Sequence, residues 1–385
     1  MVFTRSISRA APQSTENPSI QTQCSGTFSG AVLLTASPLR PMPFNASCGP
    51  TLSRSGAVIE ASQPLVGQKR AASSQVSDEE GSSRGSRYKK NTEFSSRLFQ
   101  ETTLVYDRLH VAPQHTRLRG TSDLSALPDG VNSEGLPDLA LSGSAAINPA
   151  LIGQIQRLAQ EKAILVVDLR KEPHAVANNH SVTWTIPNNW LNIDKPLSVA
   201  IQDEQQRIHQ VRQEKPESLV LVHHKDYKKE LARPVRMTMP LPHFQSEQEL
   251  VERNGMNYAR IGVADHLRPV DAEVDRFVST VRSMPKDTWL HVHCKGGQGR
   301  TTTFMVLYDI LNNAGRVSLA DIAVRQMHFG FGYDVASEGL KVERQQFRKD
   351  RWAFIQSFYD YAKANPKGQP LLWSEWHTNA QKTQA

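Results

Sequence analysis

Apolar residues recur with helical spacing in two segments of the chain, at 149–158 and 272–283. The first segment has Asn148 at the cap position and Pro149 at the first helical position, with the apolar residues that follow on one face. In the second segment the apolar residues occupy the i, i+3, i+4 and i+7 positions, namely Val274, Phe277, Val278 and Val281. Both patterns predict amphipathic helices with one buried face.

Short apolar runs between these helices predict β-strands. They lie at 164–167, 219–222, 258–261 and 289–292. The last run leads into a glycine-rich loop and then into a helix predicted from Arg300 to about Asn312. Helices and apolar strands that alternate in this way indicate an α/β fold with a central sheet flanked by helices.

Residues 1–90 show neither helical nor strand periodicity. They contain seventeen serines, and their one compact apolar stretch, 31–34, is too short to nucleate a core. We therefore expect residues 1–95 to be disordered and residues 96–385 to form one folded domain. The first residues are polar, poor in acids and without an apolar signal-peptide core, so three interpretations remain open: a type III secretion leader, an organellar transit peptide, and a tail without an address.

The net charge of +7 is concentrated in residues 1–90, whose ten basic and five acidic residues account for +5 of it. Because the remainder is nearly neutral, a nucleic-acid partner is not expected, and an anion would have to bind at a local cluster. No apolar run approaches the ~20 residues of a membrane span. The three cysteines, Cys24, Cys48 and Cys294, cannot form a disulfide framework, which directs attention to free-thiol chemistry.

Residues 291–303 read HVHCKGGQGRTTT and combine a thiol with an anion-binding loop. Cys294 follows the strand predicted at 289–292 and Arg300 opens the next helix, so backbone N–H groups and a helix N-terminus converge on one point. That environment favours the thiolate, and Arg300 can hold two oxygens of a phosphoryl group in its planar fork. Thr301 offers a hydroxyl that can stabilise the thiolate and assist its departure. The pattern predicts a phosphate site with a cysteine nucleophile at its base.

A second Cys-x5-Arg pair, Cys48 and Arg54, has the same spacing but no preceding strand or histidine, and Pro50 lies inside its loop. That copy is not expected to be a site. At Cys294 the alternative is a buried structural cysteine before an ordinary helix. The full pattern His-Cys-x-x-Gly-x-x-Arg-Thr between a strand and a helix favours the nucleophile.

The loop resembles the signature of protein-tyrosine-phosphatase-like cysteine phosphatases, and the longer run 289–306 resembles the cysteine phytases, phosphatases of inositol hexakisphosphate. Further stretches similar to that family are the strand end and Glu-x-His pair at 166–174, the loop at 264–269, and Trp-Ser-Glu-Trp at 373–376. The resemblance covers about residues 115–378 and is greatest to the type III effector phytases of plant-pathogenic bacteria. It implies a cysteine-phosphatase core with a central mixed sheet and a small β-rich subdomain inserted beside it.

The resemblance also implies that Asp265 is the general acid that protonates the leaving group, and that His266 contacts the substrate. Asp265 lies 29 residues before Cys294, in a loop after the strand predicted at 258–261. Asp271 is the rival acid on spacing, but it precedes a helix and we expect it to be the N-cap of that helix.

Substrate phosphates are expected to meet the loop itself and a basic rim. The loop contributes Lys295, Gly296, Gly297, Gln298 and Gly299, and the family's basic positions match Arg344, Arg351 and Arg119. Arg344 and Arg351 are seven residues apart and therefore share a helical face, whereas Gly120 departs from the family's spacing beside Arg119. Further candidates from an inserted region are Lys225, Lys228 and Lys229.

No metal or other cofactor is expected. Asp168 is interpreted as a structural residue that orients a loop near the site, and His293 as one that fixes the loop by hydrogen bonds. The sequence shows no acidic or histidine cluster with the spacing of metal ligands.

The favoured function is a phosphatase that acts on inositol hexakisphosphate and lower inositol phosphates through a Cys294 phosphocysteine. The alternatives are a phosphotyrosine or phosphoinositide phosphatase with the same signature, and a phosphate-binding adaptor without activity. The resemblance further implies secretion by a bacterial type III system into the host cell, with a secretion chaperone as a candidate partner of the N-terminal region.

Overall fold

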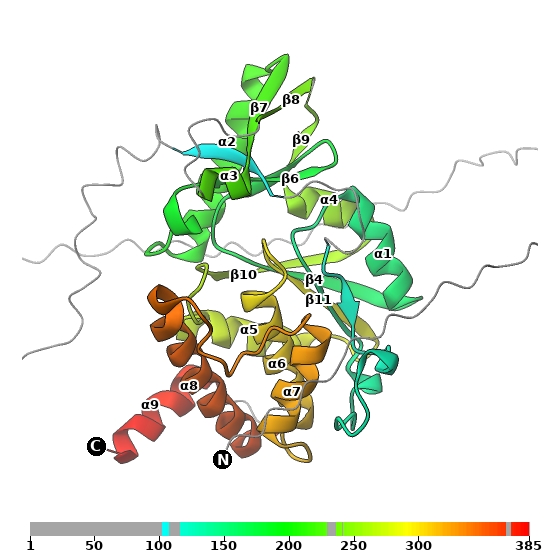
Figure 1. Cartoon of the computed structure of the whole chain (residues 1–385), viewed down its shortest axis with the longest axis vertical. Coiled ribbons are helices and arrows are strands. Elements are labelled where there is room, and N and C mark those ends of the chain that lie inside the picture. The colour runs from blue at the N-terminus through cyan, green and yellow to red at the C-terminus, as the bar shows by residue number, and fades with distance from the viewer. Residues whose placement is uncertain (1–101, 108–115, 229–235, 241, 367–370, 385) are drawn as a thin grey trace, which may run out of the picture. The chain divides into compact units, whose positions relative to one another are not determined.

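The computed structural model describes residues 102–107, 116–228, 236–240, 242–366 and 371–384, all within the unit Gly81–Ala385 (Figure 1). These residues form two sheets. The central sheet has five strands in the order β10 (Asn257–Val263), β4 (Ala163–Arg170), β11 (Thr288–His293), β3 (Leu141–Ser144) and β2 (Arg119–Gly120). The first four are parallel and β2 is antiparallel to β3, so the carboxyl ends of the parallel strands meet at one edge.

Alternate residues of each central strand point to opposite faces, and both faces are covered by helices. Val167 and Leu169 of β4 belong to one core, whereas Ile164 and Val166 belong to another. The larger core packs against α5 (Asp271–Ser283), α6 (Gly299–Asn313), α7 (Leu319–Phe329), α8 (Val342–Ala364) and α9 (Trp373–Gln384). The smaller core packs against α1 (Pro149–Ala159) and α4 (Glu247–Arg253).

A second, mixed sheet forms a β-rich lobe, drawn at the top of Figure 1. Its strand order is β8 (Arg236–Pro240), β7 (Ser218–His223), β1 (Thr103–Tyr106), β6 (His180–Thr185), β5 (His174–Ala177) and β9 (Phe244–Gln245). Strands β5 to β9 lie between β4 and β10 in the chain, together with α2 (Leu197–Glu214) and α3 (His224–Lys228). Short 3-10 helices complete the described elements: Leu124–Ala126, Pro137–Leu139 and Pro187–Asn189.

The predicted fold class is confirmed: a mixed α/β core with a β-rich lobe inserted beside it. The cap of α1 is also confirmed, because the Asn148 side chain accepts a hydrogen bond from the Leu151 backbone N–H. Within the described residues, every helix is too short or too polar to cross a membrane. Residues 1–95, with Cys48 and Arg54, lie outside the described part, so the boundary at 95 stays a prediction.

The prediction that Asp271 caps α5 is wrong. The N-cap is Val270, and Asp271 is already the first helical residue. Its carboxylate instead accepts hydrogen bonds from Arg268 Nη1 and Trp373 Nε1, each at 3.0 Å. Asp271 therefore fastens α9 to the start of α5, a role that depends on a tryptophan about a hundred residues further along the chain.

Trp373 is the residue through which α9 joins the larger core. Its side chain is 1% exposed and packs edge-on against Phe354 and Tyr361, with ring centroids 5.4 and 5.8 Å apart. We predict that Trp373→Ala lowers the free energy of unfolding by ~3–5 kcal/mol, because it leaves a cavity in a packed core. The measurement is urea unfolding of the variant and of Trp376→Ala, which removes the half-buried tryptophan of the same helix. Equal losses in the two variants would contradict the assignment.

Candidate active site

Cys294 is the first residue after β11, at the edge where the parallel strands end. The strand lies between β4 and β3, and α6 begins five residues later at Gly299. Helix α6 is buried along most of its length, from Arg300 to Ile310, because it packs between the sheet and helices α7 and α8. The Cys294–Arg300 loop is therefore fixed at both ends by the most buried elements of the core.

The shape of the loop depends on Gly297. Its φ is +66°, and a Cβ there would lie 2.6 Å from the backbone nitrogen of Ala145. By contrast, a Cβ on Gly296 would meet nothing within 4 Å, so this part of the loop borders open space. The N-cap of α6 is Gln298, whose side chain makes no capping hydrogen bond. The first N–H groups of α6 are therefore available to an anion.

The Cys294 thiol is 3% exposed, and the Thr301 hydroxyl donates a hydrogen bond to its Sγ at 3.1 Å. Burial alone would raise the pKa of this thiol. The positive charge of Arg300 and the hydrogen bonds from Thr301 outweigh burial, and they lower the pKa below its ordinary value. The arrangement therefore favours a thiolate nucleophile.

The guanidinium group of Arg300 has one edge bound to Glu172, and its other edge carries the Nε–H. Its Nη1 donates to Glu172 Oε2 at 2.7 Å and to the Val263 carbonyl at 2.9 Å, and its Nη2 donates to Glu172 Oε1 at 2.9 Å. Of the five N–H donors of a guanidinium, this leaves Nε–H and one Nη2–H, and Nε has no hydrogen-bond partner. These two donors lie on the same edge, which matches two oxygens of a phosphoryl group.

Arg300 and Lys295 are linked by a chain of buried charges with alternating sign, which we name the ion chain. Arg300 pairs with Glu172 at 2.7 Å, Glu172 with Arg170 at 3.2 Å, Arg170 with Asp107 at 3.2 Å, and Asp107 with Lys295 at 3.1 Å. All five side chains are almost completely buried. Lys295, predicted to face substrate, therefore has its ammonium group directed at Asp107 of the lobe.

Asp265 lies two residues after the end of β10 and its carboxylate approaches Arg300, with Oδ1 3.4 Å from Nη2. Asn189 of the lobe donates to Asp265 Oδ2 at 2.9 Å. Burial acts to raise the pKa of Asp265, but the charges of Arg300 and His266 and the Asn189 hydrogen bond hold it well below its usual range. The structure thus brings the predicted nucleophile, arginine and acid together, with the acid ionised in the free protein.

Arg119 supports the Cys294–Arg300 loop by donating a hydrogen bond to one of its backbone carbonyl groups. Its Nη1 donates to Gly297 O at 2.8 Å and its Nη2 to Thr302 Oγ1 at 3.1 Å, and the side chain is 7% exposed. The neighbouring Arg117 donates to Gly296 O at 2.7 Å. These contacts orient carbonyl oxygens toward the two arginines. A direct contact of Arg119 with substrate stays a prediction.

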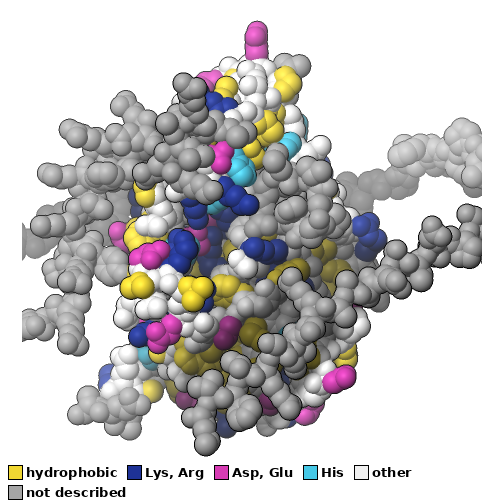
Figure 2. Space-filling view, in the orientation of Figure 1, with side chains coloured by type: hydrophobic (Ala, Val, Ile, Leu, Met, Phe, Trp, Pro, Cys, Tyr) yellow, Lys and Arg dark blue, Asp and Glu magenta, His cyan; other side chains and the backbone are white. Residues whose placement is uncertain are grey.

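Basic side chains gather across the middle of the face shown in Figure 2. Arg351 is buried and donates to Tyr333 Oη at 2.7 Å and to the His266 carbonyl at 2.6 Å, so it holds the Asp265 loop. Arg344 and Lys228 lie close enough to His266 to help burial lower the pKa of His266 to about 4. These groups form a cationic rim beside Asp265. Of the other two lysine candidates, Lys225 is exposed on α3, and Lys229 lies outside the described residues.

A buried polar cluster lies on the other face of the sheet, behind the loop. Within the described part of the chain, one group of side chains is close enough together to hold a metal ion: Asp168, Glu247 and His293. The sequence did not predict this group. In this structure His293 Nε2 lies 2.6 Å from Glu247, and Arg260 Nε lies 3.2 Å from Asp168. Burial lowers the pKa of His174, but Glu204 and Asp168 raise it well above its ordinary value, so this histidine is a further cation facing the carboxylates. The carboxylates of Asp168 and Glu204 thus each face the cations Arg260 and His174 behind the end of β11.

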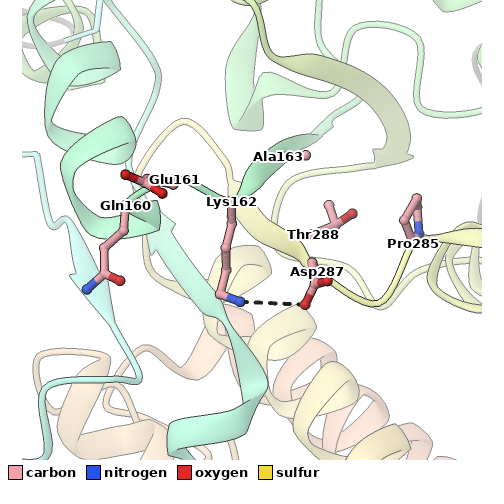
Figure 3. A pocket seen from close by; sticks show the side chains of 7 residues that line it. All are labelled: Gln160, Glu161, Lys162, Ala163, Pro285, Asp287 and Thr288. Atoms are coloured by element: carbon pink, nitrogen blue, oxygen red, sulfur yellow. Dashed lines mark ion pairs between the residues drawn. The ribbon is translucent and has the colours of Figure 1, made fainter.

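An open pocket lies at the opposite end of the sheet, where β4 and β11 begin (Figure 3). Lys162 and Asp287 face each other across it with 4.0 Å between Nζ and Oδ1. Since β11 is six residues long and a strand rises ~3.3 Å per residue, this pocket is about 20 Å from Cys294. It shares no residue with the Cys294–Arg300 loop.

Two residues that hold Asp265 and Arg300 were missed as functional residues. Glu172 was noticed within the Glu-x-His pair, but nothing in the sequence connected it with Arg300, 128 residues away. Asn189 had one local signal, the Pro187-Asn188-Asn189 turn, in which consecutive asparagines are typical of left-handed backbone.

Comparison with known proteins agrees with this geometry. The family model PTPlike_phytase, described as "Inositol hexakisphosphate", matches residues 167–312, which include Asp265 and the Cys294–Arg300 loop. A protein-tyrosine-phosphatase-like phytase from Bdellovibrio bacteriovorus is 33% identical, with 71% of this chain and 94% of that chain covered and a TM-score of 0.57. The chain belongs to the protein-tyrosine-phosphatase-like phytase family.

Two further relatives of this phytase-family chain are longer than it. A myo-inositol phosphatase from Mitsuokella multacida, solved with myo-inositol-(1,3,4,5)-tetrakisphosphate, is 29% identical with a TM-score of 0.64 over 72% of this chain. The effector protein hopD2 of Pseudomonas syringae pv. tomato is 32% identical over 72% of this chain. The chain spans 49% of the Mitsuokella protein and 60% of hopD2.

Glu172 provides a test of the ion chain. We predict that Glu172→Gln lowers kcat/KM for an aryl phosphate by about ten- to a hundredfold, because Arg300 loses a charge-assisted bidentate contact worth ~1.5–3 kcal/mol. Glu204→Gln is the matched control, since Glu204 pairs with Arg260 in the cluster behind the sheet. Thermal unfolding and kinetics of both variants are compared. An equal fall in kcat/KM for the two would show that Glu172 acts only through stability.

Proposed function

We propose that this chain is a phosphatase that removes phosphate from inositol hexakisphosphate and lower inositol phosphates through a phosphocysteine at Cys294. The observation that supports this most directly is the convergence of three groups. The Cys294 thiol has a lowered pKa, Arg300 has its Nε–H without a hydrogen-bond partner, and Asp265 Oδ1 lies 3.4 Å from Nη2 on the same edge of the guanidinium. A nucleophile, a phosphate-binding cation and a proton donor are the groups that phosphomonoester hydrolysis needs.

In the first step the Cys294 thiolate attacks phosphorus while Arg300 and the loop N–H groups bind the equatorial oxygens. The P–O bond to the inositol breaks, and Asp265 gives its proton to the departing oxygen. In the second step Asp265 takes a proton from water, which attacks the phosphocysteine and releases inorganic phosphate. The Thr301 hydroxyl stabilises the thiolate as it departs.

Asp265 must be protonated for the first step, although its pKa is held low in the free protein. The main cause of that lowering is the charge of Arg300, which acts against burial. When a phosphate dianion binds to Arg300 it neutralises this charge and places negative charge beside Asp265, and both effects raise the pKa of the carboxyl group. The substrate thereby promotes the protonation of its own general acid.

The cationic rim supports a substrate with several phosphates. Lys228, Arg344 and His266 lie beside Asp265, where the phosphates of a bound inositol that are not being cleaved would be placed. The Mitsuokella relative binds an inositol tetrakisphosphate, which is consistent with this substrate class. A phosphotyrosine residue carries only one phosphate and would leave the cations Lys228 and Arg344 without a phosphate to bind.

We further propose that the protein is an effector of a plant-pathogenic bacterium, delivered by a type III system into the host cell. The relative hopD2 is an effector protein of such a bacterium. Residues 1–95, whose first residues are polar and poor in acids, would carry the secretion address and bind a secretion chaperone.

The proposed activity is tested with the full chain and inositol hexakisphosphate. Cys294→Ser should lower turnover by at least about a hundredfold and still bind phosphate, because an unassisted hydroxyl is a far weaker nucleophile than the thiolate. Phosphate release and separation of the inositol phosphate products measure the reaction. Turnover retained in Cys294→Ser would exclude the phosphocysteine. Turnover of a phosphotyrosine peptide but not of inositol phosphates would favour a protein phosphatase.

The role of the N-terminal region is tested by deletion of residues 1–90, which contain no residue of the proposed site. We expect kcat/KM for inositol hexakisphosphate to change by less than about twofold, which corresponds to well under the ~1.4 kcal/mol of a tenfold change. Export from a bacterium with a type III system should stop. Export of a neutral reporter fused to residues 1–90 is the complementary measurement. Continued export of the deleted chain would contradict the address.

A further inference from the structure

The structure assigns to Asn189 the role of positioning residue for the general acid Asp265. The inference rests on the proposed function, and it names a residue outside the Cys294–Arg300 loop on which proton transfer depends. Asn189 belongs to the β-rich lobe, and Asp265 follows β10 of the central sheet. Their contact joins the two parts of the fold at the reacting groups.

The backbone between β6 and α2 turns Asn189 inward. Asn188 and Asn189 have φ of +62° and +56°, in the left-handed region that asparagine tolerates better than most residues. The two neighbours have opposite surroundings as a result: Asn188 is exposed, whereas Asn189 is 2% exposed. Two consecutive left-handed residues are costly and persist where the surroundings hold them.

The orientation of the Asn189 amide follows from its partners. Lys295 Nζ lies 3.2 Å from Asn189 Oδ1 and can only donate, so Oδ1 must be the atom that faces it. Thr185 Oγ1 also donates to Oδ1, at 2.7 Å. The amide nitrogen is thereby directed at Asp265 Oδ2, to which it donates at 2.9 Å. Oδ2 thus has a side-chain donor from the lobe fixed on it, while the backbone N–H of His266 donates to Oδ1 at 3.1 Å.

A second contact from the same turn holds the backbone of the acid. Trp190 Nε1 donates to the Asp265 carbonyl at 2.9 Å, and the Trp190 ring packs edge-on against Phe347 of α8. Oδ2 is bonded to Asn189, whereas Oδ1 accepts one hydrogen bond from the His266 backbone N–H at 3.1 Å and faces Arg300, 3.4 Å from Nη2. Oδ1 is therefore the oxygen placed to carry the proton toward a phosphoryl group on Arg300.

The test uses full-length Asn189→Gly and Asn189→Asp, because both residues accept the left-handed backbone. Asn188→Asp is the matched control for Asn189→Asp, because it makes the same substitution at the neighbouring asparagine, whose side chain is exposed. Kinetics are measured on inositol hexakisphosphate, whose alkoxide leaving group needs a proton, and on p-nitrophenyl phosphate, whose leaving group needs one far less. Asp265→Asn and Cys294→Ser are measured beside them.

We expect Asn189→Gly to lower kcat for inositol hexakisphosphate by about tenfold or more, a part of the 10²–10⁴ that a general acid contributes, with KM changed less than about twofold. Its kcat for p-nitrophenyl phosphate should fall much less. In Asn189→Asp a donor is lost and a negative charge is added beside Asp265. Both changes raise the pKa of the acid, so the alkaline limb of the kcat profile should move to higher pH. Asn188→Asp should match the wild type.

The outcomes separate this inference from the proposed function. If Asp265→Asn slows inositol hexakisphosphate hydrolysis selectively while both Asn189 variants match the wild type, the positioning role is overturned and the function stands. If Asn189→Gly slows both substrates equally, the residue supports the loop through Lys295 and not the acid, which also overturns it. Full activity in Cys294→Ser would instead overturn the proposed function.

Discussion

The site depends on one electrostatic constraint: a cation at each end of the Cys294–Arg300 loop must be balanced inside the protein. Five charges in a row meet this constraint, from Arg300 through Glu172, Arg170 and Asp107 to Lys295. Taking so many charges out of water is expensive, and loss of any one would leave its neighbour buried and unpaired. In return, the orientation of the Arg300 guanidinium is fixed before substrate binds, with its Nε–H left for a phosphate oxygen.

The two parts of the fold divide the chemistry between them. In the proposed mechanism the nucleophile and the phosphate-binding arginine come from the central sheet and α6, whereas the lobe provides the groups that hold Asp265 and Lys295. Because Arg300 contacts both Glu172 and Asp265, its charge is shared between a carboxylate that fixes it and the carboxylate proposed to be the general acid. In the proposed mechanism, phosphate bound to Arg300 would weaken its interaction with Asp265, and substrate binding would thereby favour the protonation of Asp265.

The sequence was informative wherever a signal is local. The strand before Cys294, the glycines after it and the cap of α1 involve neighbours in the chain, and each was found where predicted. The contacts of Lys295 with Asp107, of Asp271 with Trp373 and of Asn189 with Asp265 join residues 188, 102 and 76 positions apart, and no periodicity reports such contacts. Asp271 was therefore expected to cap a helix, because that is what an aspartate before a helix does in the absence of a distant partner. The pairing of Lys295 with Asp107 could not be expected either, and its contact with substrate stays a prediction.

Strand β1 has a consequence for the order in which the protein can assemble. It is the first described strand in the chain, yet it pairs with β6 and β7, and Asp107 at its end pairs with Lys295 near the last third of the chain. Contacts of such long sequence separation form late, since the intervening chain must be ordered first. During synthesis from the N-terminus, Asp107 would therefore lack its partner Lys295 until most of the polypeptide has been made. Until that pairing forms, Lys295 lacks its buried counter-charge, so a partly folded chain would hold the Cys294 thiol in a loop that is not yet fixed.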